Sequence, residues 1–370
     1  MARALRLAKR GYYSTHPNPR VGCVLVRDGQ CVGEGYHAQA GQAHAERQAL
    51  AEAGERARGA TVYVNLEPCA HHGRTPPCTE ALIAAKVGRV VAAMIDPNPA
   101  VAGQGVAQLT AAGIAVDVGV LESAAQQLNR GFIQRMTRQR PWVCCKLAAS
   151  LDGRTALADG SSKWISGEDS RRDVQRLRAA SSAIVTGIGT VLADDPALNV
   201  RLDPHTDAPP LDDHVLRQPL RVIVDSRLRT PSAARLLHLR GQTLIATCAD
   251  TTHPRAAALL AAGAELITCP DASGTQVDLT RLMTRLAERE INELLIEAGA
   301  TLAGAALTAG LIDEIRLYLA PHLMGDSARG LFHLPALEQM TQRRQLTIID
   351  WRPIGSDLRI IALPDNGMMQ

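Results

Sequence analysis

A histidine and two cysteines, His44, Cys69 and Cys78, limit the folds open to the N-terminal part of this chain, because one metal ion can bind all three only if they meet in space. One imidazole and two thiolates suit tetrahedral zinc with three protein ligands, which leaves the fourth position to a water that the metal acidifies. Glu46 follows the histidine by two positions and is the expected proton shuttle. The sequence therefore predicts a catalytic zinc site with these three ligands.

A disulfide between Cys69 and Cys78 is the main alternative for the same residues. Nothing in the sequence marks the chain for export, which disfavours it. The order His44-Ala45-Glu46, then Pro68-Cys69, is also typical of zinc-dependent nucleobase deaminases, in which the glutamate is not a ligand. The other six cysteines lie in apolar, strand-like runs, where a free thiol behaves as a small hydrophobic group.

Composition narrows the class of protein. The chain has 370 residues, enough for two or three domains, with 46% hydrophobic and 21% charged residues. A net charge of +3 and an aromatic share of 3% argue against a nucleic-acid-binding surface. No apolar run reaches the roughly 18 residues that a membrane span needs. We therefore expect a cytoplasmic protein with a small-molecule substrate and neither nucleic acid nor membrane as a partner.

Strand and helix patterns alternate through the first half of the chain. A hairpin is expected from Val21 to Gly35, with its turn at Asp28-Gly29. Further strands are expected over 61–66, 89–94 and 114–118, and helices over 1–10, 44–53 and 78–85. This alternation predicts a three-layer α/β/α domain with metal ligands at two helix N-termini, where thiolates are favoured.

A break near Gln134 to Pro141 divides the chain into expected domains 1–139 and 140–370, with the basic stretch Arg135 to Arg140 as linker. Asp203 to Gln218 is rich in Asp, Pro and His and is expected to be a surface loop. Strands are expected over 143–148, 181–185, 220–224, 243–246, 265–267, 293–296 and 314–319. They predict a second α/β domain.

The second half carries no complete glycine fingerprint for a dinucleotide. Glu297 ends a predicted strand, and a turn of small residues from Gly299 to Gly304 leads into a helix. Such a turn suits a phosphate, but it equally suits tight packing of helix on sheet. The arginines of this half likewise suit either a phosphorylated ligand or solvated helix faces.

Taken together, these motifs resemble the bifunctional deaminase/reductase family of riboflavin biosynthesis along nearly the whole chain. The spacer of eight residues between Cys69 and Cys78 is typical of that family and longer than in most nucleoside deaminases. The matching segments are His16-Pro17-Asn18-Pro19, Val21-Gly22, His44-Ala45-Glu46, Leu66 to Cys78, Lys146 to Arg154, Trp164-Ile165, Leu192 to Pro196 and Glu297-Ala298-Gly299.

The resemblance implies a cytidine-deaminase-like N-terminal domain and a dihydrofolate-reductase-like C-terminal domain. It implies that zinc-activated water deaminates 2,5-diamino-6-ribosylamino-4(3H)-pyrimidinone 5′-phosphate, with Glu46 carrying the proton. NADPH would then reduce the ribosyl chain of 5-amino-6-(5-phosphoribosylamino)uracil to the ribityl form. Members of the family are commonly dimers or tetramers, so a homo-oligomer is expected.

The resemblance also implies site residues. Asn18, His71, Arg74 and Thr75 would line the pyrimidine and its phosphate arm, and Lys146 and Asp152 would assist at the sugar. The residues that would hold the second substrate are Ser162, Arg178, Leu198, Arg201 and Glu297. Those that would contact NADPH are Ala148, Trp164, Thr190, Asp194, Ser226, Gly299, Ala300, Thr301, Leu302, Ala303, Gly304 and Ala305.

Two other classes of function compete with this interpretation. A nucleic-acid or nucleoside deaminase with an accessory domain predicts a basic, aromatic-lined groove, which the composition disfavours. A non-catalytic scaffold held together by zinc predicts four protein ligands, whereas three good ones are evident and Glu46 would have no purpose.

Overall fold

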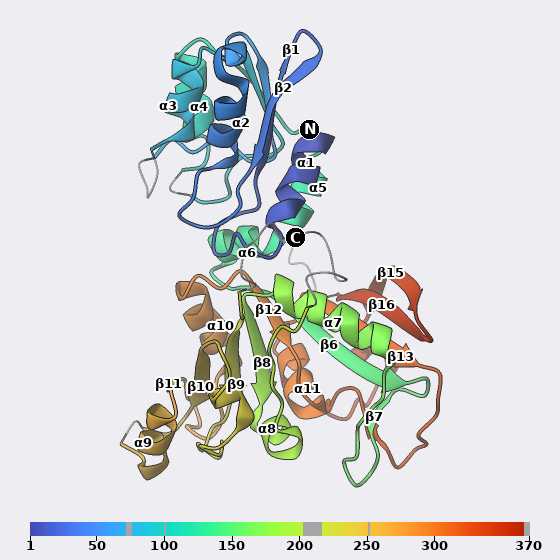
Figure 1. The fold of residues 1–370 in the computed structure, drawn as a ribbon. Coiled ribbons are helices and arrows are strands. Elements are labelled where there is room, and N and C mark those ends of the chain that lie inside the picture. The colour runs from blue at the N-terminus through green and yellow to red at the C-terminus, as the bar shows by residue number, and fades with distance from the viewer. Residues whose placement is uncertain (72–75, 100, 203–216, 251, 366–370) are drawn as a thin grey trace. The chain divides into compact units, whose positions relative to one another are not determined.

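A computed structural model describes residues 1–71, 76–99, 101–202, 217–250 and 252–365 (Figure 1). The chain separates into two compact units, the first within Met1–Arg140 and the second beginning at Pro141. No helix within the described ranges combines the length and the apolar character needed to cross a membrane. Most of the predicted surface loop, together with Arg74 and Thr75, lies outside the described residues.

A five-stranded sheet with the order β2-β1-β3-β4-β5 forms the centre of the first unit. The predicted hairpin is confirmed: β1 and β2 pair antiparallel, and Asp28 and Gly29 turn between them with φ of 51° and 76°. β3, β4 and β5 are parallel to one another. The strands are β1 (Gly22–Arg27), β2 (Gln30–Tyr36), β3 (Thr61–Val64), β4 (Arg89–Ala92) and β5 (Ala115–Val118).

Helices cover both faces of this sheet, so the predicted three-layer arrangement is confirmed. Cys23 and Leu25 of β1 share one hydrophobic cluster with residues of α2, α3 and α4, whereas Val24 packs against α1 on the other face. The helices are α1 (Ala2–Ala8), α2 (Ala45–Ala53), α3 (Cys78–Ala84), α4 (Gln104–Ala111), α5 (Glu122–Leu128) and α6 (Arg130–Arg138).

Two glycines of β2 place α2 directly on the sheet. A Cβ at Gly33 would lie 2.2 Å from the Ala49 carbonyl oxygen, and one at Gly35 would lie 2.6 Å from that of Ala45. Neither distance is possible for a real side chain, so only glycine allows this approach. The contact fixes the start of α2, where His44 and Glu46 lie.

The prediction of a linker from Arg135 to Arg140 is wrong over most of its length. α6 continues to Arg138, and Gln134 is buried within it. Arg135 and Arg138 lie in the last turn of α6, where Arg138 is exposed and the Arg135 guanidinium carbon lies 5.8 Å from the ring centroid of the buried Phe132.

The second unit is built on a nine-stranded sheet with the order β11-β10-β9-β8-β12-β6-β13-β16-β15. The seven strands from β11 to β13 in this order are parallel, and β16 and β15 are antiparallel additions at one edge. The strands are β6 (Trp142–Ser150), β8 (Ala183–Gly187), β9 (Leu220–Val224), β10 (Thr243–Thr247), β11 (Ala264–Thr268), β12 (Glu293–Ile296), β13 (Glu314–Ala320), β15 (Leu346–Ile354) and β16 (Asp357–Pro364).

Helices also cover both faces of the second sheet. α10 and α11 pack on one face in the largest hydrophobic cluster, while α7, α8 and α9 pack on the other. Two short strands, β7 (Arg154–Ala156) and β14 (Arg329–Gly330), pair separately. The helices are α7 (Glu168–Ala180), α8 (Ile188–Asp194), α9 (Pro254–Ala261), α10 (Leu279–Glu288) and α11 (Ala300–Thr308).

Candidate functional site

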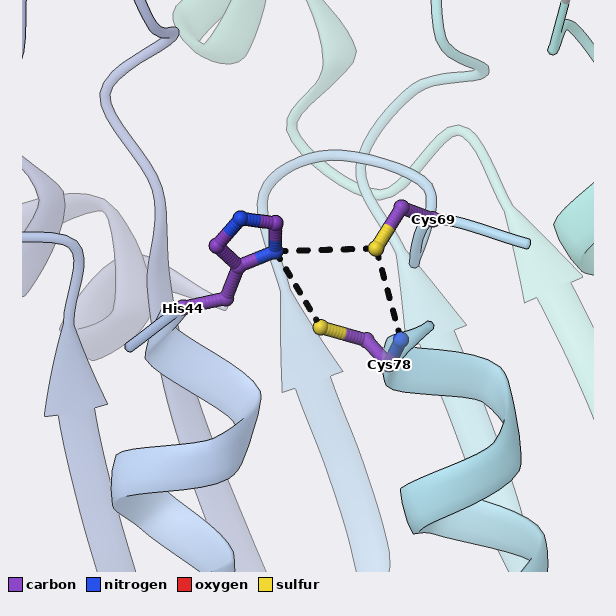
Figure 2. Close-up of side chains that lie close together, drawn as sticks. All are labelled: His44, Cys69 and Cys78. Atoms are coloured by element: carbon purple, nitrogen blue, oxygen red, sulfur yellow. Dashed lines mark hydrogen bonds between the residues drawn. The ribbon is translucent and has the colours of Figure 1, made fainter. Parts of the chain in front are cut away.

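The structure brings His44, Cys69 and Cys78 together, with their ligand atoms within 4.8 Å of one another (Figure 2). His44 precedes α2 as its N-cap, Cys78 is the first residue of α3, and Cys69 lies in the loop after β3. The Nδ1 atom of His44 is 3.5 Å from Sγ of Cys69 and 3.3 Å from Sγ of Cys78. A tetrahedral zinc ion with ordinary bond lengths separates nitrogen and sulfur ligands by about 3.5 Å. The three side chains therefore fit zinc.

Hydrogen bonds already favour one thiolate in this cluster. The thiol of Cys78 donates to Cys69, and with His44 and the Cys78 backbone N–H it lowers the pKa of Cys69 to about 4. The same bond, together with burial, raises the pKa of Cys78. Removal of the second proton requires a nearby positive charge, which a divalent cation supplies.

Glu46 lies in the first turn of α2, two residues from His44, and only 3% of it is exposed. Burial raises the pKa of its carboxyl group, and the charge of Cys69 adds to the effect. A carboxyl group with a raised pKa beside a metal-bound water is suited both to take and to return a proton. Glu46 therefore lies where a proton shuttle is needed.

The sequence analysis missed His37, which packs edge-on against His44 with ring centroids 5.3 Å apart. His37 is buried, its Nδ1 is 3.2 Å from the Ala43 carbonyl oxygen, and its Nε2 is 3.0 Å from the Asn18 amide nitrogen. The structure thus links Asn18 to the metal cluster through His37. No fixed spacing from the zinc motif marked His37 in the sequence.

A second acid was also missed beside this cluster. Burial raises the pKa of Asp96 to about 6, and its charge interacts with Cys69 and with His71, whose side chain is exposed. The carboxylate of Glu67 accepts the backbone N–H groups of Asp96 and of two residues near α4 and so fixes this loop. The available signal for Asp96 in the sequence was its position as an acidic residue shortly after β4, a strand of the parallel part of the sheet.

In the second unit, the structure joins two predicted substrate residues, Arg178 and Glu297, in a nearly buried ion pair. Two guanidinium nitrogens of Arg178 lie 2.6 and 2.9 Å from the two carboxylate oxygens of Glu297. The side chains are 12% and 10% exposed. Burial opposes ionisation of Glu297, but the charges of Arg178, Lys146 and Arg201 prevail and hold its pKa below the usual value.

Lys146 of β6 belongs to the same charge cluster. Burial lowers the pKa of its ammonium group, and the nearby Glu297 partly opposes that shift. Arg201 donates to the Asn199 side chain at 2.6 Å and is one of the charges acting on Glu297. Four residues from separate segments thus form one cluster of charged side chains.

The predicted cofactor turn follows β12 and opens α11. Gly299 is the N-cap of α11, and a Cβ there would meet nothing within 4 Å. Gly304, by contrast, packs so closely that a Cβ would lie 2.1 Å from the His333 carbonyl oxygen. α8 begins after Gly187 at the end of β8, the neighbour of β12. Two helix starts therefore lie at one end of the sheet, where their free N–H groups suit phosphates.

The remaining predicted contacts are spread over the same unit. Trp164 is 74% exposed and stacks with Arg171, whose guanidinium carbon is 4.9 Å from the ring centroid. Asp194 lies 3.7 Å from the Lys163 ammonium group.

The other predicted contacts lie on separate elements. Ser162 and Thr190 are partly exposed. Ala148 lies on β6 opposite Tyr318 of β13. The Ser226 hydroxyl accepts the Val277 N–H.

The side chains of two predicted site residues, Leu198 and Asp152, are engaged in packing or in hydrogen bonds within the fold. The Leu198 side chain is buried in a cluster with Leu177 and Leu295, so only its backbone is free to meet a ligand. Asp152 accepts the backbone N–H groups of Met324 and Gly325, which lower its pKa to about 2 together with Ser150, the largest contributor. Asp152 thus holds a turn as an ionised group.

Comparison with known proteins identifies both units. Residues 1–94 match the family model described as the cytidine and deoxycytidylate deaminase zinc-binding region, and residues 141–360 match the RibD C-terminal domain. The riboflavin biosynthesis protein RibD of Escherichia coli is 51% identical over 361 residues, covering 97% of this chain and 96% of that protein. The chain belongs to the RibD family.

Solved structures of RibD proteins share the fold. That of Acinetobacter baumannii RibD (form 1) has a TM-score of 0.90 at 46% identity and covers 98% of this chain and 97% of its own. A Thermotoga maritima protein named diaminohydroxyphosphoribosylaminopyrimidine deaminase/5-amino-6-(5-phosphoribosylamino)uracil reductase has a TM-score of 0.84 at 32% identity, covering 98% and 97%. The chain has a RibD-type fold, with a cytidine-deaminase-like first part and a dihydrofolate-reductase-like second part, as predicted.

Proposed function

We propose that this chain catalyses two consecutive steps of riboflavin biosynthesis. The first removes an amino group from 2,5-diamino-6-ribosylamino-4(3H)-pyrimidinone 5′-phosphate, and the second reduces the ribosyl chain of 5-amino-6-(5-phosphoribosylamino)uracil with NADPH. The observation that carries the proposal is the meeting of His44, Cys69 and Cys78 beside the buried Glu46, in a chain that matches RibD proteins from end to end.

In the deamination, His44, Cys69 and Cys78 would hold zinc, which would supply the Lewis acidity that makes water a nucleophile near neutral pH. Glu46 takes the proton of that water and delivers it to the departing ammonia. Asn18 is held by His37 and lines the pyrimidine, together with His71, Arg74 and Thr75. The low dielectric around the buried Glu46 strengthens its electrostatic interactions with His44 and Cys69.

In the reduction, bound NADPH would be the hydride donor to C1′ of the opened sugar. The Arg178–Glu297 pair and Arg201 hold the substrate, with Ser162 and the Leu198 backbone beside them. Lys146 assists at the reacting sugar. The N–H groups at the Gly299 turn favour the phosphates of the cofactor. The cofactor contacts are Ala148, Trp164, Thr190, Asp194, Ser226 and Gly299, Ala300, Thr301, Leu302, Ala303, Gly304 and Ala305.

We assign the two activities to domains 1–139 and 140–370. The family-model matches fall on either side of this boundary, at 1–94 and 141–360. A cytoplasmic location suits the chain because none of its eight cysteines forms a disulfide, a state that a reducing compartment preserves.

Two coupled measurements test the proposal. The zinc-loaded protein is given the diaminopyrimidine phosphate, and ammonia release is followed before NADPH is added and its oxidation recorded by absorbance. We expect both signals, with oxidation depending on prior deamination. Ammonia release from cytidine or from a deoxycytidine oligonucleotide, with none from the diaminopyrimidine, would instead support a nucleoside or nucleic-acid deaminase.

Arg201→Ala tests the placement of the substrate. We expect a rise in KM for the deaminated substrate of about 10-fold or more, because a lost charge-assisted hydrogen bond is worth about 1.5–3 kcal/mol. Arg172→Ala is the matched control. The described ion pairs of Arg172, with Glu168 and Asp169, lie at the surface, and its side chain is about half exposed. Unchanged kinetics of Arg201→Ala would contradict the assignment.

We also propose that the chain forms a homo-oligomer through β15. This strand is the edge of the nine-stranded sheet, and Ile348, Ile349 and Trp351 on it are 58%, 50% and 67% exposed. Apolar edge strands of this kind are suited to pairing with a second copy. Light scattering should give a lower molar mass for the Ile348→Lys variant than for the wild type. Equal masses would contradict the assignment.

A further inference from the structure

The carboxylate of Asp357, at the start of β16, is buried against the first turn of α7. Its Oδ2 atom accepts the Gly167 backbone N–H at 2.7 Å and the Ser170 hydroxyl at 2.6 Å. Gly167 is the N-cap of α7 and has no side chain with which to cap the helix. The cap is therefore supplied by a residue 190 positions further along the chain.

The turn before Asp357 is shaped for this close approach. Gly355 has a φ of 57°, and a Cβ there would lie 2.5 Å from the Asp169 carboxylate. A Cβ at Gly167 would lie 3.3 Å from the Ser356 hydroxyl. The β15–β16 turn and the start of α7 thus pack as one piece.

The start of α7 in turn holds the segment that precedes it. Arg171 donates to the Ser166 carbonyl oxygen at 2.6 Å and stacks on the Trp164 ring. Trp164 and Ser162 are the residues to which we assign NADPH and substrate contacts. Because Trp164 is mostly exposed, its position depends on these few contacts with the helix start.

The other end of the same helix carries Arg178, which pairs with Glu297. Between the two ends, Asp173 accepts the Tyr318 hydroxyl at 2.7 Å and is 3.1 Å from Arg359. α7 is thus fixed at its start, middle and end. The start of α7 is the point nearest in sequence to Ser162 and Trp164, the residues assigned to the substrate and to NADPH.

We propose that Asp357 is a positioning residue of the reductase site, which caps α7 and thereby holds the Ser162–Trp164 segment where NADPH binds. This inference rests on the proposed reductase function. No residue assigned to the reaction hydrogen-bonds Asp357 in the described structure, so its loss acts through the segment and weakens cofactor binding more than turnover.

Asp357→Ala in the full-length protein tests this role in two ways. In the protein without cofactor, we expect faster hydrogen exchange of the Gly167 to Arg171 amides. In titrations, we expect a dissociation constant and a KM for NADPH raised about 10-fold, which corresponds to about 1.4 kcal/mol. The kcat should stay within about 2-fold, and ammonia release from the first unit should not change.

Two further variants separate positioning from general stability. Asp357→Asn keeps one acceptor oxygen, so we expect an intermediate dissociation constant, and it carries the same test if Asp357→Ala does not fold. His253→Ala removes the cap of α9, where His253 accepts the Arg255 N–H at 3.2 Å, and should leave NADPH binding unchanged.

Faster exchange together with weaker NADPH binding supports the inference. An Asp357→Ala protein with wild-type exchange, or with a wild-type dissociation constant, would overturn it while leaving the proposed function intact. A wild-type protein that neither binds nor oxidises NADPH would overturn the reductase function and this inference together.

Discussion

Glu46 combines burial with a place two residues after a metal ligand, and this combination makes its role testable by one small change. Glu46→Gln keeps the size and one oxygen of the side chain but cannot take a proton. We expect ammonia release to fall by about 10²–10⁴-fold, the usual contribution of general acid–base catalysis. Zinc content, measured by metal analysis, should stay the same. Ammonia release that persists with zinc bound would rule out the proton shuttle.

The Arg178–Glu297 pair makes a second prediction for single residues. Glu297→Gln leaves the Arg178 guanidinium buried without its counter-charge, so we expect unfolding of the second unit to become easier by about 3–5 kcal/mol. Glu265→Gln breaks a surface pair with Arg289 and should cost at most about 1 kcal/mol. All three tryptophans lie beyond Pro141, so their emission in urea follows this unit alone.

The ionisation of Glu297 should make the second unit less stable at acidic pH. The pKa of Glu297 is lower in the folded protein than its usual value of 4.5, so the unfolded state binds more protons as the pH falls. The stabilisation is thus complete above about pH 4.5 and disappears as the pH drops through the folded pKa. Glu297→Gln should flatten this part of the urea stability profile. An equally steep acid loss in the variant would contradict the assignment.

Residue chemistry and spacing were enough to predict that His44, Cys69 and Cys78 meet, because ligand geometry restricts which side chains can serve. His37 and Asp96 were beyond such reasoning, since their importance arises from burial next to Cys69 and His44. The roles of single reductase residues came from family resemblance, although the residues themselves had marked the Gly299 to Gly304 turn and the arginines as possible phosphate contacts. Charge alone did not separate Arg178, which is buried, from Arg172, which is about half exposed.

At the scale of one element, two glycines of α11 lead to opposite predictions: Gly299 is the N-cap of the helix, and Gly304 lies within it. Gly304→Ala would place a Cβ 2.1 Å from the His333 carbonyl oxygen, so we expect the second unit to lose about 1–3 kcal/mol of stability. Gly299→Ala meets open space at a φ of −73°, so the fold should tolerate it. Its Cβ would instead hinder a phosphate, and KM for NADPH should rise. Equal Tm values for the two variants would contradict this distinction.

Elements with a clear local sequence pattern were predicted well, and some elements without one were missed. β9 and β12 begin and end where the sequence placed them. β15 and β16 were not predicted, because β15 exposes its apolar residues and so lacks the alternation of a half-buried strand. Their place in the sheet depends on pairing with β13, a contact that no local pattern indicates.

For the whole molecule, the division into two compact units predicts that the activities can be lost separately. Removal of zinc with a chelator should abolish ammonia release. NADPH oxidation should continue when the deaminated substrate is supplied directly, because the residues assigned to reduction all lie beyond Pro141. Loss of both activities on chelation, reversed by added zinc, would show that the units depend on each other.

The late position of β16 also affects how the protein is made. At about 5–20 residues per second, a ribosome needs about 10–40 s to travel from the end of the first unit to Asp357. During that interval the zinc ligands are already outside the exit tunnel, while α7 lacks its cap. A nascent chain can therefore bind zinc long before it can bind NADPH. Once β13 has been made and has paired with β6, its other edge stays open until β16 follows, and that edge is the surface that a chaperone would have to protect.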